Sequence, residues 1–295
     1  MVGTMLFSRF FLMPVLSVLL AGCASQYVSS TPGQKAPVKS RFTIRRNIVY
    51  TPADWPAPVS GDLYQPVDAE SAPAVLLVHG GGWTGSDGRW QMAPLAKKLA
   101  SRGYVVLNVT YRLAPKWIYP APVEDLQQAV KWMRTHAADS GIDPDRISTY
   151  GYSAGGYLAA LVGLDETMRI QAIVAGGTPA DLTLYPGGDL VPQFLGGTKQ
   201  QIPERFHEAS PVNHVTRHSP PVFIYHGGAD TLVPPEHAWE FDAVLTNHKV
   251  PHELYWIQGR IHIPAFLFPG GSVDAAVDFL DRKTGISAPE SAHDR

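Results

Sequence analysis

Short apolar runs alternate with amphipathic segments along most of this chain, and this alternation constrains the fold more than any other feature. The central runs are almost continuously apolar, as expected for strands that are covered on both faces of a sheet. They are Ala74 to His79, Tyr104 to Tyr111, Arg146 to Tyr152, Ile170 to Ala175 and Val222 to His226. We place a final strand at about Glu253 to Ile257.

Helical patterns separate these runs. Apolar residues recur at spacings of three and four within residues 123–133 and again within residues 241–245, which places them on one face of a helix. Strands that alternate with such helices predict crossover connections and a mainly parallel, doubly wound α/β sheet with helices on both faces. Two earlier segments, Phe42 to Thr51 and Leu63 to Val67, predict an antiparallel edge.

Length and composition predict one globular domain over residues 41–283, followed by a polar, disordered tail at 284–295. Within the domain, residues from about 178 to 220 interrupt the alternation with many prolines and glycines, which predicts a small cap inserted over the sheet. The net charge is −2 and like charges form no block, so we expect no nucleic-acid partner.

The N-terminal residues have the pattern of an export signal. Arg9 precedes an apolar run from Phe10 to Ala21, which has the length of a signal-peptide core and is short for a membrane span. We therefore expect residues 1–22 to be a signal peptide. Residues 23–40 are rich in Ser, Pro, Gly and Lys, as a flexible tether would be.

The run ends at Leu20-Ala21-Gly22-Cys23, which resembles the lipobox of bacterial lipoproteins. That resemblance implies an acylated Cys23 that holds an exported protein on a membrane surface, and a lone cysteine has no internal disulfide partner. Since Ala24 stands where an Asp favours the inner membrane, the resemblance further implies the outer membrane, facing the periplasm. A plain secretory signal with an incidental cysteine is the alternative.

A Gly-x-Ser-x-Gly motif lies where an apolar run meets a helix-like segment. It reads Gly151-Tyr152-Ser153-Ala154-Gly155, and this strand-to-helix context is the one in which the motif forms a nucleophile elbow. The sharp turn has no room for a Cβ at the two glycines. Ser153 is therefore the candidate nucleophile, and an ordinary glycine-rich turn that opens a helix is the alternative.

A second motif, His79-Gly80-Gly81-Gly82-Trp83, directly follows an apolar run. Consecutive glycines let the backbone bend so that amides point into a cavity, and the amides of Gly81, Gly82 and Ala154 could then bind an oxyanion. A phosphate-binding loop is less favoured, because the Gly-x-Gly-x-x-Gly spacing and a following Lys-Ser/Thr are both absent. His79 is expected to orient this loop, and Trp83, Trp117 and Tyr157 are candidates to line the pocket.

With these motifs in view, the chain resembles the hormone-sensitive-lipase group of α/β-hydrolases and, more closely, BD-FAE-like bacterial esterases of the feruloyl- and acetyl-esterase type. Further matching segments are Tyr111-Arg112-Leu113-Ala114-Pro115, Gly141-Ile142-Asp143-Pro144-Asp145-Arg146-Ile147 and His226-Gly227-Gly228-Ala229-Asp230. The resemblance implies an α/β-hydrolase fold with an eight-stranded, mainly parallel sheet. It also implies hydrolysis of carboxylic esters.

The same resemblance assigns a catalytic triad in the chain order Ser, acid, His. Asp230 matches the acid in the family's His-Gly-x-x-Asp pattern, and Asp181 is the alternative acid. His262 follows the final strand and is the expected base, although Ile263 and Pro264 depart from the residues that usually follow it. His252 begins the same strand and should lie at the wrong end of the sheet.

The function expected from these residues is that of a serine carboxylesterase, which cleaves small esters through an acyl-enzyme on Ser153. No cofactor and no metal is expected, since His214 and His218 have ligand-like spacing without a convincing third partner. A serine peptidase or amidase of the prolyl-peptidase type, and a non-catalytic binding protein on the same fold, remain alternatives.

Overall fold

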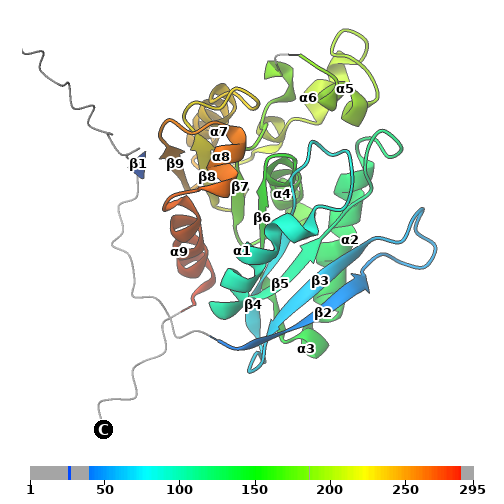
Figure 1. Ribbon diagram of the computed structural model, residues 1–295, viewed down its shortest axis with the longest axis vertical. Coiled ribbons are helices and arrows are strands. Elements are labelled where there is room, and N and C mark those ends of the chain that lie inside the picture. The colour runs from blue at the N-terminus through cyan, green and yellow to red at the C-terminus, as the bar shows by residue number, and fades with distance from the viewer. Residues whose placement is uncertain (1–25, 28–39, 186, 287–295) are drawn as a thin grey trace, which may run out of the picture.

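A nine-stranded sheet forms the centre of the computed structural model, which describes residues 26–27, 40–185 and 187–286. The strand order across the sheet is β1-β9-β8-β7-β6-β4-β5-β3-β2 (Figure 1). The strands are β1 (Gln26–Tyr27), β2 (Phe42–Val49), β3 (Ser60–Pro66), β4 (Ala72–Val78), β5 (Val105–Val109), β6 (Ile142–Tyr152), β7 (Ile173–Gly176), β8 (Val222–Gly227) and β9 (His252–Ile257).

The central strands from β5 to β9 pair in parallel, as their continuous apolar runs predicted. Strands β5, β7 and β8 are buried along their whole length, because helices cover both faces of the sheet. The predicted antiparallel edge is also confirmed, since β3 pairs antiparallel with both β5 and β2. Strands β5 and β6, which follow β4 in the chain, pair on opposite sides of β4. An open α/β sheet forms its ligand crevice at such a switch point.

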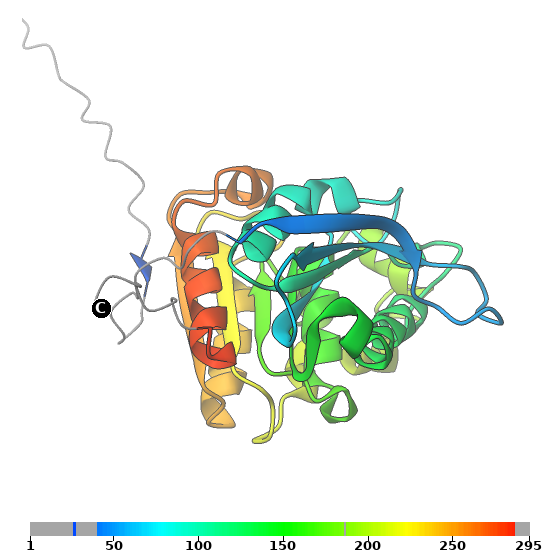
Figure 2. The ribbon, with the colours of Figure 1, turned by 90° about the horizontal axis from the view of Figure 1, so that it is seen from below.

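Helices cover the sheet in two layers (Figures 1 and 2). One layer packs α2, α4 and α7 against one face, and the other packs α1, α8 and α9 against the opposite face. The helices are α1 (Arg89–Ser101), α2 (Ala121–Thr135), α3 (Ala137–Ser140), α4 (Ala154–Leu164), α5 (Leu190–Leu195), α6 (Pro203–Glu208), α7 (Glu236–Asn247), α8 (His262–Leu267) and α9 (Ser272–Thr284).

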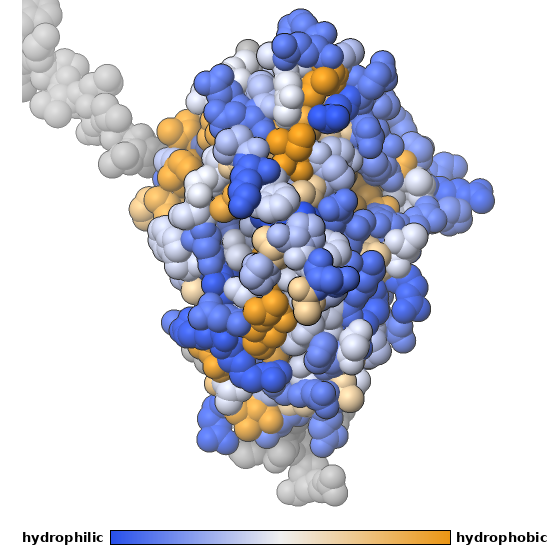
Figure 3. Space-filling model, turned by 90° about the vertical axis from the view of Figure 1, so that its right-hand side faces the viewer, coloured by the Kyte–Doolittle hydropathy of each residue, from blue (hydrophilic) through white to orange (hydrophobic). Residues whose placement is uncertain are grey.

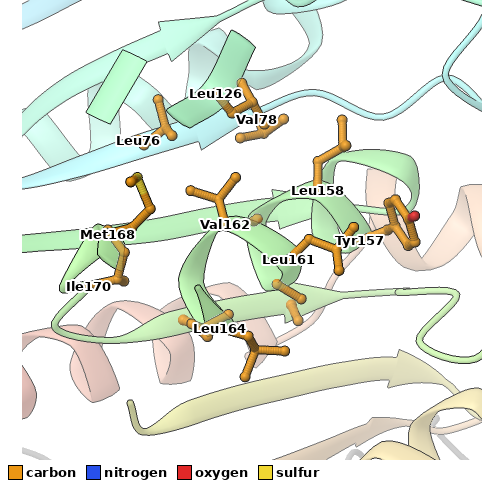
Figure 4. Close-up of a cluster of buried hydrophobic side chains, with 14 of the residues drawn as sticks. Leu76, Val78, Leu126, Tyr157, Leu158, Leu161, Val162, Leu164, Met168 and Ile170 are labelled. Carbon is orange, nitrogen blue, oxygen red and sulfur yellow. The ribbon is translucent and has the colours of Figure 1, made fainter. Parts of the chain in front are cut away.

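Helix α4 is buried on every side and holds the centre of one layer (Figure 4). Its Leu158 and Val162 pack toward Leu76 and Val78 of β4 and toward Leu126 of α2. A helix that is apolar around its whole circumference needs such complete cover. This packing fixes the N-terminus of α4, and therefore the position of Ser153, relative to the sheet.

The connection between β7 and β8 forms the insertion that the sequence suggested. It contains α5, α6 and the 3-10 turns η2 (Leu182–Leu184) and η3 (Pro211–His214), and it lies at the end of the sheet where β6 meets α4 (Figure 1). The hydroxyl of Tyr157 donates to the carbonyl of Ala209 at 2.7 Å, which ties this insertion to α4.

Some elements were not predicted. The sequence patterns predicted neither helix α1 nor helix α9. Gln26 and Tyr27 were expected in a flexible tether, but they form β1 and pair antiparallel with β9. Cys23 and the expected signal peptide lie outside the described residues, as do the remaining tether residues up to 39 and the end of the chain after residue 286.

The surface of the described residues is mixed in character. On the side shown in Figure 3, hydrophilic residues predominate and hydrophobic ones form small, separate groups. None of the helices among the described residues combines the length and apolar character that a membrane span requires.

Candidate active site

Ser153 occupies the sharp turn between β6 and α4. Its φ of 57° and ψ of −126° are unusual for a residue with a side chain, which is the kind of strain that elbow turns store. The turn is tight because a Cβ on Gly151 would lie 2.1 Å from the carbonyl oxygen of Gly155, and one on Gly155 would lie 2.2 Å from that of Val78. Both glycines are therefore required by their surroundings.

Ser153, His262 and Asp230 form one continuous line of hydrogen bonds. The Ser153 hydroxyl lies 2.8 Å from Nε2 of His262, and Nδ1 of His262 lies 2.6 Å from Oδ2 of Asp230. Because a carboxylate only accepts, Nδ1 carries the proton and Nε2 is free to accept from the serine. The structure thus brings together the three distant residues that the sequence suggested for the triad.

Asp230 is held in a fixed orientation by its own loop. Its Oδ1 accepts hydrogen bonds from the amides of Leu232 at 3.0 Å and Val233 at 2.9 Å, which leaves Oδ2 for His262. Burial alone raises the pKa of this carboxyl, but the hydrogen bonds from His262 and from the amide of Val233 outweigh burial and hold the pKa below its ordinary value. The group is therefore an anion at neutral pH, as the orienting member of a triad must be.

The alternative acid and the alternative histidine lie elsewhere. Asp181 accepts from the amide of Thr183 at 2.8 Å and caps η2 instead of contacting His262. His252 opens β9 and lies 3.1 Å from a carboxylate oxygen of Asp242. Neither residue takes part in the hydrogen-bonded line to Ser153.

The glycine loop packs directly on the nucleophile turn. A Cβ on Gly80 would lie 2.9 Å from the Tyr152 carbonyl oxygen, and Gly81 and Gly82 adopt φ values of 114° and 63° that favour glycine. Within the part of the chain that the structure describes, the amides of Gly81, Gly82 and Ala154 donate to no protein acceptor. Gly82 and Ala154 line the same cavity as Ser153, so their amides are available to an oxyanion there.

His79 stabilises this loop through its ring. Nδ1 donates to the carbonyl of Gly80 at 2.6 Å, Nε2 accepts from the Thr110 hydroxyl at 3.2 Å, and the ring stacks on Tyr111. Burial lowers the pKa of His79, so the ring is neutral at pH 7. These contacts support the orienting role that the sequence suggested, because the ring bonds to the glycine loop itself.

A small apolar cavity of about 50 Å³ opens beside Ser153. It is lined by Gly82, Trp83, Ser153, Ala154, Pro179, Tyr185, Leu190, Val191, Leu232 and Val233. Trp83 stacks on Phe194 at 4.4 Å between ring centres, and Tyr157 packs edge-on behind both. Of the aromatic residues considered from the sequence, Trp83 lines the cavity, Tyr157 supports it from behind, and Trp117 instead lies against the Arg112 guanidinium.

Two positioning residues were missed from the sequence. The hydroxyl of Tyr152 donates to the backbone carbonyl of His262 at 2.7 Å, and its ring lies 5.2 Å from the imidazole. The buried His226 donates from Nε2 to the carbonyl of Val233 at 2.8 Å, within the loop that carries Asp230. Both residues lie inside motifs that the sequence analysis identified. Their hydrogen-bond partners depend on the tertiary fold, so the sequence alone did not indicate their roles.

We expect Tyr152→Phe to lower kcat about fivefold with little change in KM, because the hydrogen bond that positions His262 contributes about 1 kcal/mol. Steady-state kinetics on a small soluble ester measures both parameters. Tyr104→Phe is the matched control, since its buried hydroxyl bonds Asp281 far from the site. The control should lose thermal stability at unchanged kcat; if Tyr152→Phe behaves in the same way, its hydroxyl has only a structural role.

Among the described residues, no group of three or more His, Cys, Asp or Glu side chains is arranged to hold a metal ion.

The fold and the Ser–His–Asp line together define an α/β-hydrolase with a serine at the nucleophile position. The chain belongs to the BD-FAE family, whose model matches residues 62–245. Esterase LipC of Mycobacterium tuberculosis is 30% identical over 223 residues, which cover 68% of this chain and 55% of that protein. Carboxylesterase NlhH of the same species is 39% identical over 126 residues, which cover 42% of this chain and 37% of that one.

Solved structures give the same fold over a larger share of the chain. A thermophilic esterase of Thermogutta terrifontis, Est2, superposes with a TM-score of 0.70 at 27% identity and covers 86% of this chain and 95% of its own. By contrast, this chain spans about half the length of the first curated relatives it matches, with 44%, 55% and 46% of their residues.

Proposed function

We propose that this protein is a serine carboxylesterase. The observation that carries the proposal is the unbroken line from Ser153 through His262 to Asp230, with contacts of 2.8 and 2.6 Å, beside a cavity lined by Gly82 and Ala154. The names of its relatives, which are esterases and carboxylesterases, support the same reaction class.

Each group in this site has a defined role in the reaction. Nε2 of His262 takes the hydroxyl proton as Ser153 Oγ attacks the ester carbonyl, and the amides of Gly81, Gly82 and Ala154 stabilise the oxyanion. Protonated His262 then gives its proton to the leaving alcohol, which leaves an acyl group on Ser153. Water, deprotonated by His262, attacks the acyl-enzyme, and collapse of the second oxyanion releases the acid and restores the serine.

We further propose that Cys23 carries the lipid anchor that its lipobox-like sequence suggests. The protein would then be exported and held on the cell envelope, at the outer membrane and facing the periplasm. The support is the sequence Leu20-Ala21-Gly22-Cys23 after an apolar run, together with the absence of any other cysteine in the chain. Mass spectrometry of the protein purified from the envelope tests for the acyl chains on Cys23.

The size of the cavity favours short acyl groups. About 50 Å³ holds only a few non-hydrogen atoms. In a panel of acetyl, butyryl, longer acyl and feruloyl esters beside aminoacyl amides, we expect the highest kcat/KM for the smallest acyl esters and little turnover of the amides. Faster cleavage of the amides would instead favour a peptidase or amidase.

Leu190 of α5 is expected to set the limit on acyl length, because its side chain lines the cavity and lies against Gly82. Leu190→Ala should raise the ratio of butyryl to acetyl kcat/KM about tenfold, since one methylene in an apolar pocket is worth that much. Leu184→Ala serves as the control, because this leucine of the same insertion is 41% exposed and lies outside the cavity lining. An equal ratio in both variants would remove Leu190 from this role.

A further inference from the structure

The helix that carries His262 presents an apolar surface to solvent. His262 itself is buried, but Ile261, Ile263, Leu267 and Phe268 are 49%, 56%, 59% and 62% exposed. We call these four residues the α8 patch. Exposed large apolar side chains that cluster on one short segment often mark an interaction surface, whereas single scattered ones do not.

A groove extends the α8 patch toward α1. The space between the two helices measures about 300 Å³ and is lined by Met92, Pro94 and Leu95 of α1 and by Phe266 and Leu267 of α8. Trp90, at the start of α1, is 75% exposed. The apolar surface therefore continues from α8 to the neighbouring helix. The lysine at the rim of the groove, Lys98, is paired with Asp274.

The charges around the α8 patch are those that suit a lipid headgroup layer. Residues 258–272 contain no Asp or Glu, and their one basic residue is Arg260. The guanidinium of Arg260 lies 5.9 Å from the ring centre of Phe268, so a positive charge stands next to the apolar side chains. Apolar residues flanked by a basic one bind anionic phospholipid surfaces through burial and electrostatic attraction together.

The N-terminal strand β1 lies beside β9, the strand that leads into α8. Gln26 of β1 pairs with Trp256 and Tyr27 pairs with Tyr255, and the two strands are antiparallel (Figure 1). The chain therefore enters β1 from the carboxyl end of β9, which is the end that leads into α8. Cys23 precedes Gln26 by three residues, a reach of at most about 10 Å. Trp239, which is 54% exposed, packs beside Trp256 at that end.

We propose that the α8 patch rests on the phospholipid surface to which Cys23 is anchored. The end of the sheet that holds the active site then faces the membrane. This inference rests on the proposed anchor, and it adds the orientation of the site. Gln26, which follows Cys23 by three residues, pairs with β9 at the end that leads into α8, so the short connection allows the anchor and the patch to reach one surface. Esters that are presented at the lipid surface are then the substrates best placed to reach Ser153.

The test uses the full chain, produced in a host that acylates lipoproteins and reconstituted into vesicles of phosphatidylethanolamine and phosphatidylglycerol. Acylation blocks the thiol of Cys23, so Phe268→Cys and Val67→Cys each supply a single free thiol for a fluorophore. Val67 is a matched control because it is an exposed apolar residue, 52% exposed, outside the α8 patch. Lipids with brominated acyl chains quench a fluorophore that lies in the membrane interface.

We expect brominated lipid to quench the label at position 268 about twofold or more and to leave the label at position 67 unchanged. A soluble acetyl ester should be hydrolysed equally by both variants, which shows that the active site is intact. An acylated, vesicle-bound protein with equal or no quenching at position 268 would overturn the orientation. A dimer that is dissociated by Leu267→Glu would overturn it too, because the patch would then contact a second copy.

The two parts of the proposal fail in different ways. If Cys23 carries no acyl chain by mass spectrometry and the protein stays out of the vesicle fraction, the anchor is absent and the inferred orientation falls with it. Ester hydrolysis in solution is measured independently of both, so neither result bears on the proposed reaction.

Discussion

Ser153→Ala is expected to reduce kcat for a small soluble ester by on the order of 10⁶-fold, because the variant has no nucleophile for His262 to activate. The substitution should lower kcat without disturbing the fold. The substituted residue keeps the Cβ, and the amide of residue 153 still donates to the Gly176 carbonyl at 2.7 Å, so the elbow can form. Kinetics with an acetyl ester measures the loss, and circular dichroism checks the fold.

A fluorophosphonate probe gives a second, independent measurement of the same residue. The wild-type protein should form a covalent adduct at Ser153, while Ser153→Ala should form none. Ser86→Ala is a matched control, since this serine is exposed in the loop that follows the glycine motif and should change neither labelling nor rate. Equal labelling of the wild type and of Ser153→Ala would defeat the proposed function.

Local sequence information was sufficient for the central strands and for the two glycine motifs. The central strands are buried on both faces, and such strands have continuous apolar sequences. This pattern can be recognised in each strand without knowledge of the rest of the chain. Gly151 and Gly155 were recognisable because the close approach of backbone at the elbow permits no other residue. In both cases a short stretch of sequence carries the whole signal.

Helix α1, which was not predicted, has a weak local signal. Helix α1 contains Pro94, and its first turn carries Trp90, which is 75% exposed. A proline within the segment and a tryptophan facing solvent both obscure the apolar stripe by which a helix is recognised. What holds α1 in place is its packing against the sheet through residues such as Leu99, and that is a tertiary effect.

The partners within the site depend on long-range contacts that the sequence does not contain. His262 was suggested by its place after the last strand, yet its ring is oriented by Asp230 and its backbone carbonyl is held by the hydroxyl of Tyr152. Tyr152 is separated from His262 by 110 residues. The resemblance to known esterases could identify the members of the triad, but only the packing of α8 on the elbow explains why they meet.

Asp230→Asn is expected to lower kcat by about 10⁴-fold while leaving the fold intact, because the substitution reverses the tautomer of His262. The amides of Leu232 and Val233 both donate to Oδ1, so the asparagine must keep its oxygen at that position and turn its NH₂ group toward His262. Nδ1 of the imidazole then has to accept, which places the proton on Nε2. An Nε2–H group cannot take the proton of Ser153, so the nucleophile stays inactive.

The matched control for this argument is Asp181→Asn, which removes the same charge from the alternative acid. Its Oδ1 accepts from the amide of Thr183, and an asparagine oxygen can do the same, so kcat should be unchanged. Thermal unfolding should show both variants folded, since Asp230→Asn retains the two backbone hydrogen bonds of its loop. If Asp230→Asn kept near wild-type kcat, the carboxylate would not be the group that fixes the tautomer of His262. A large loss in Asp181→Asn would point to that residue instead, and the line of contacts from Ser153 to Asp230 would need another role.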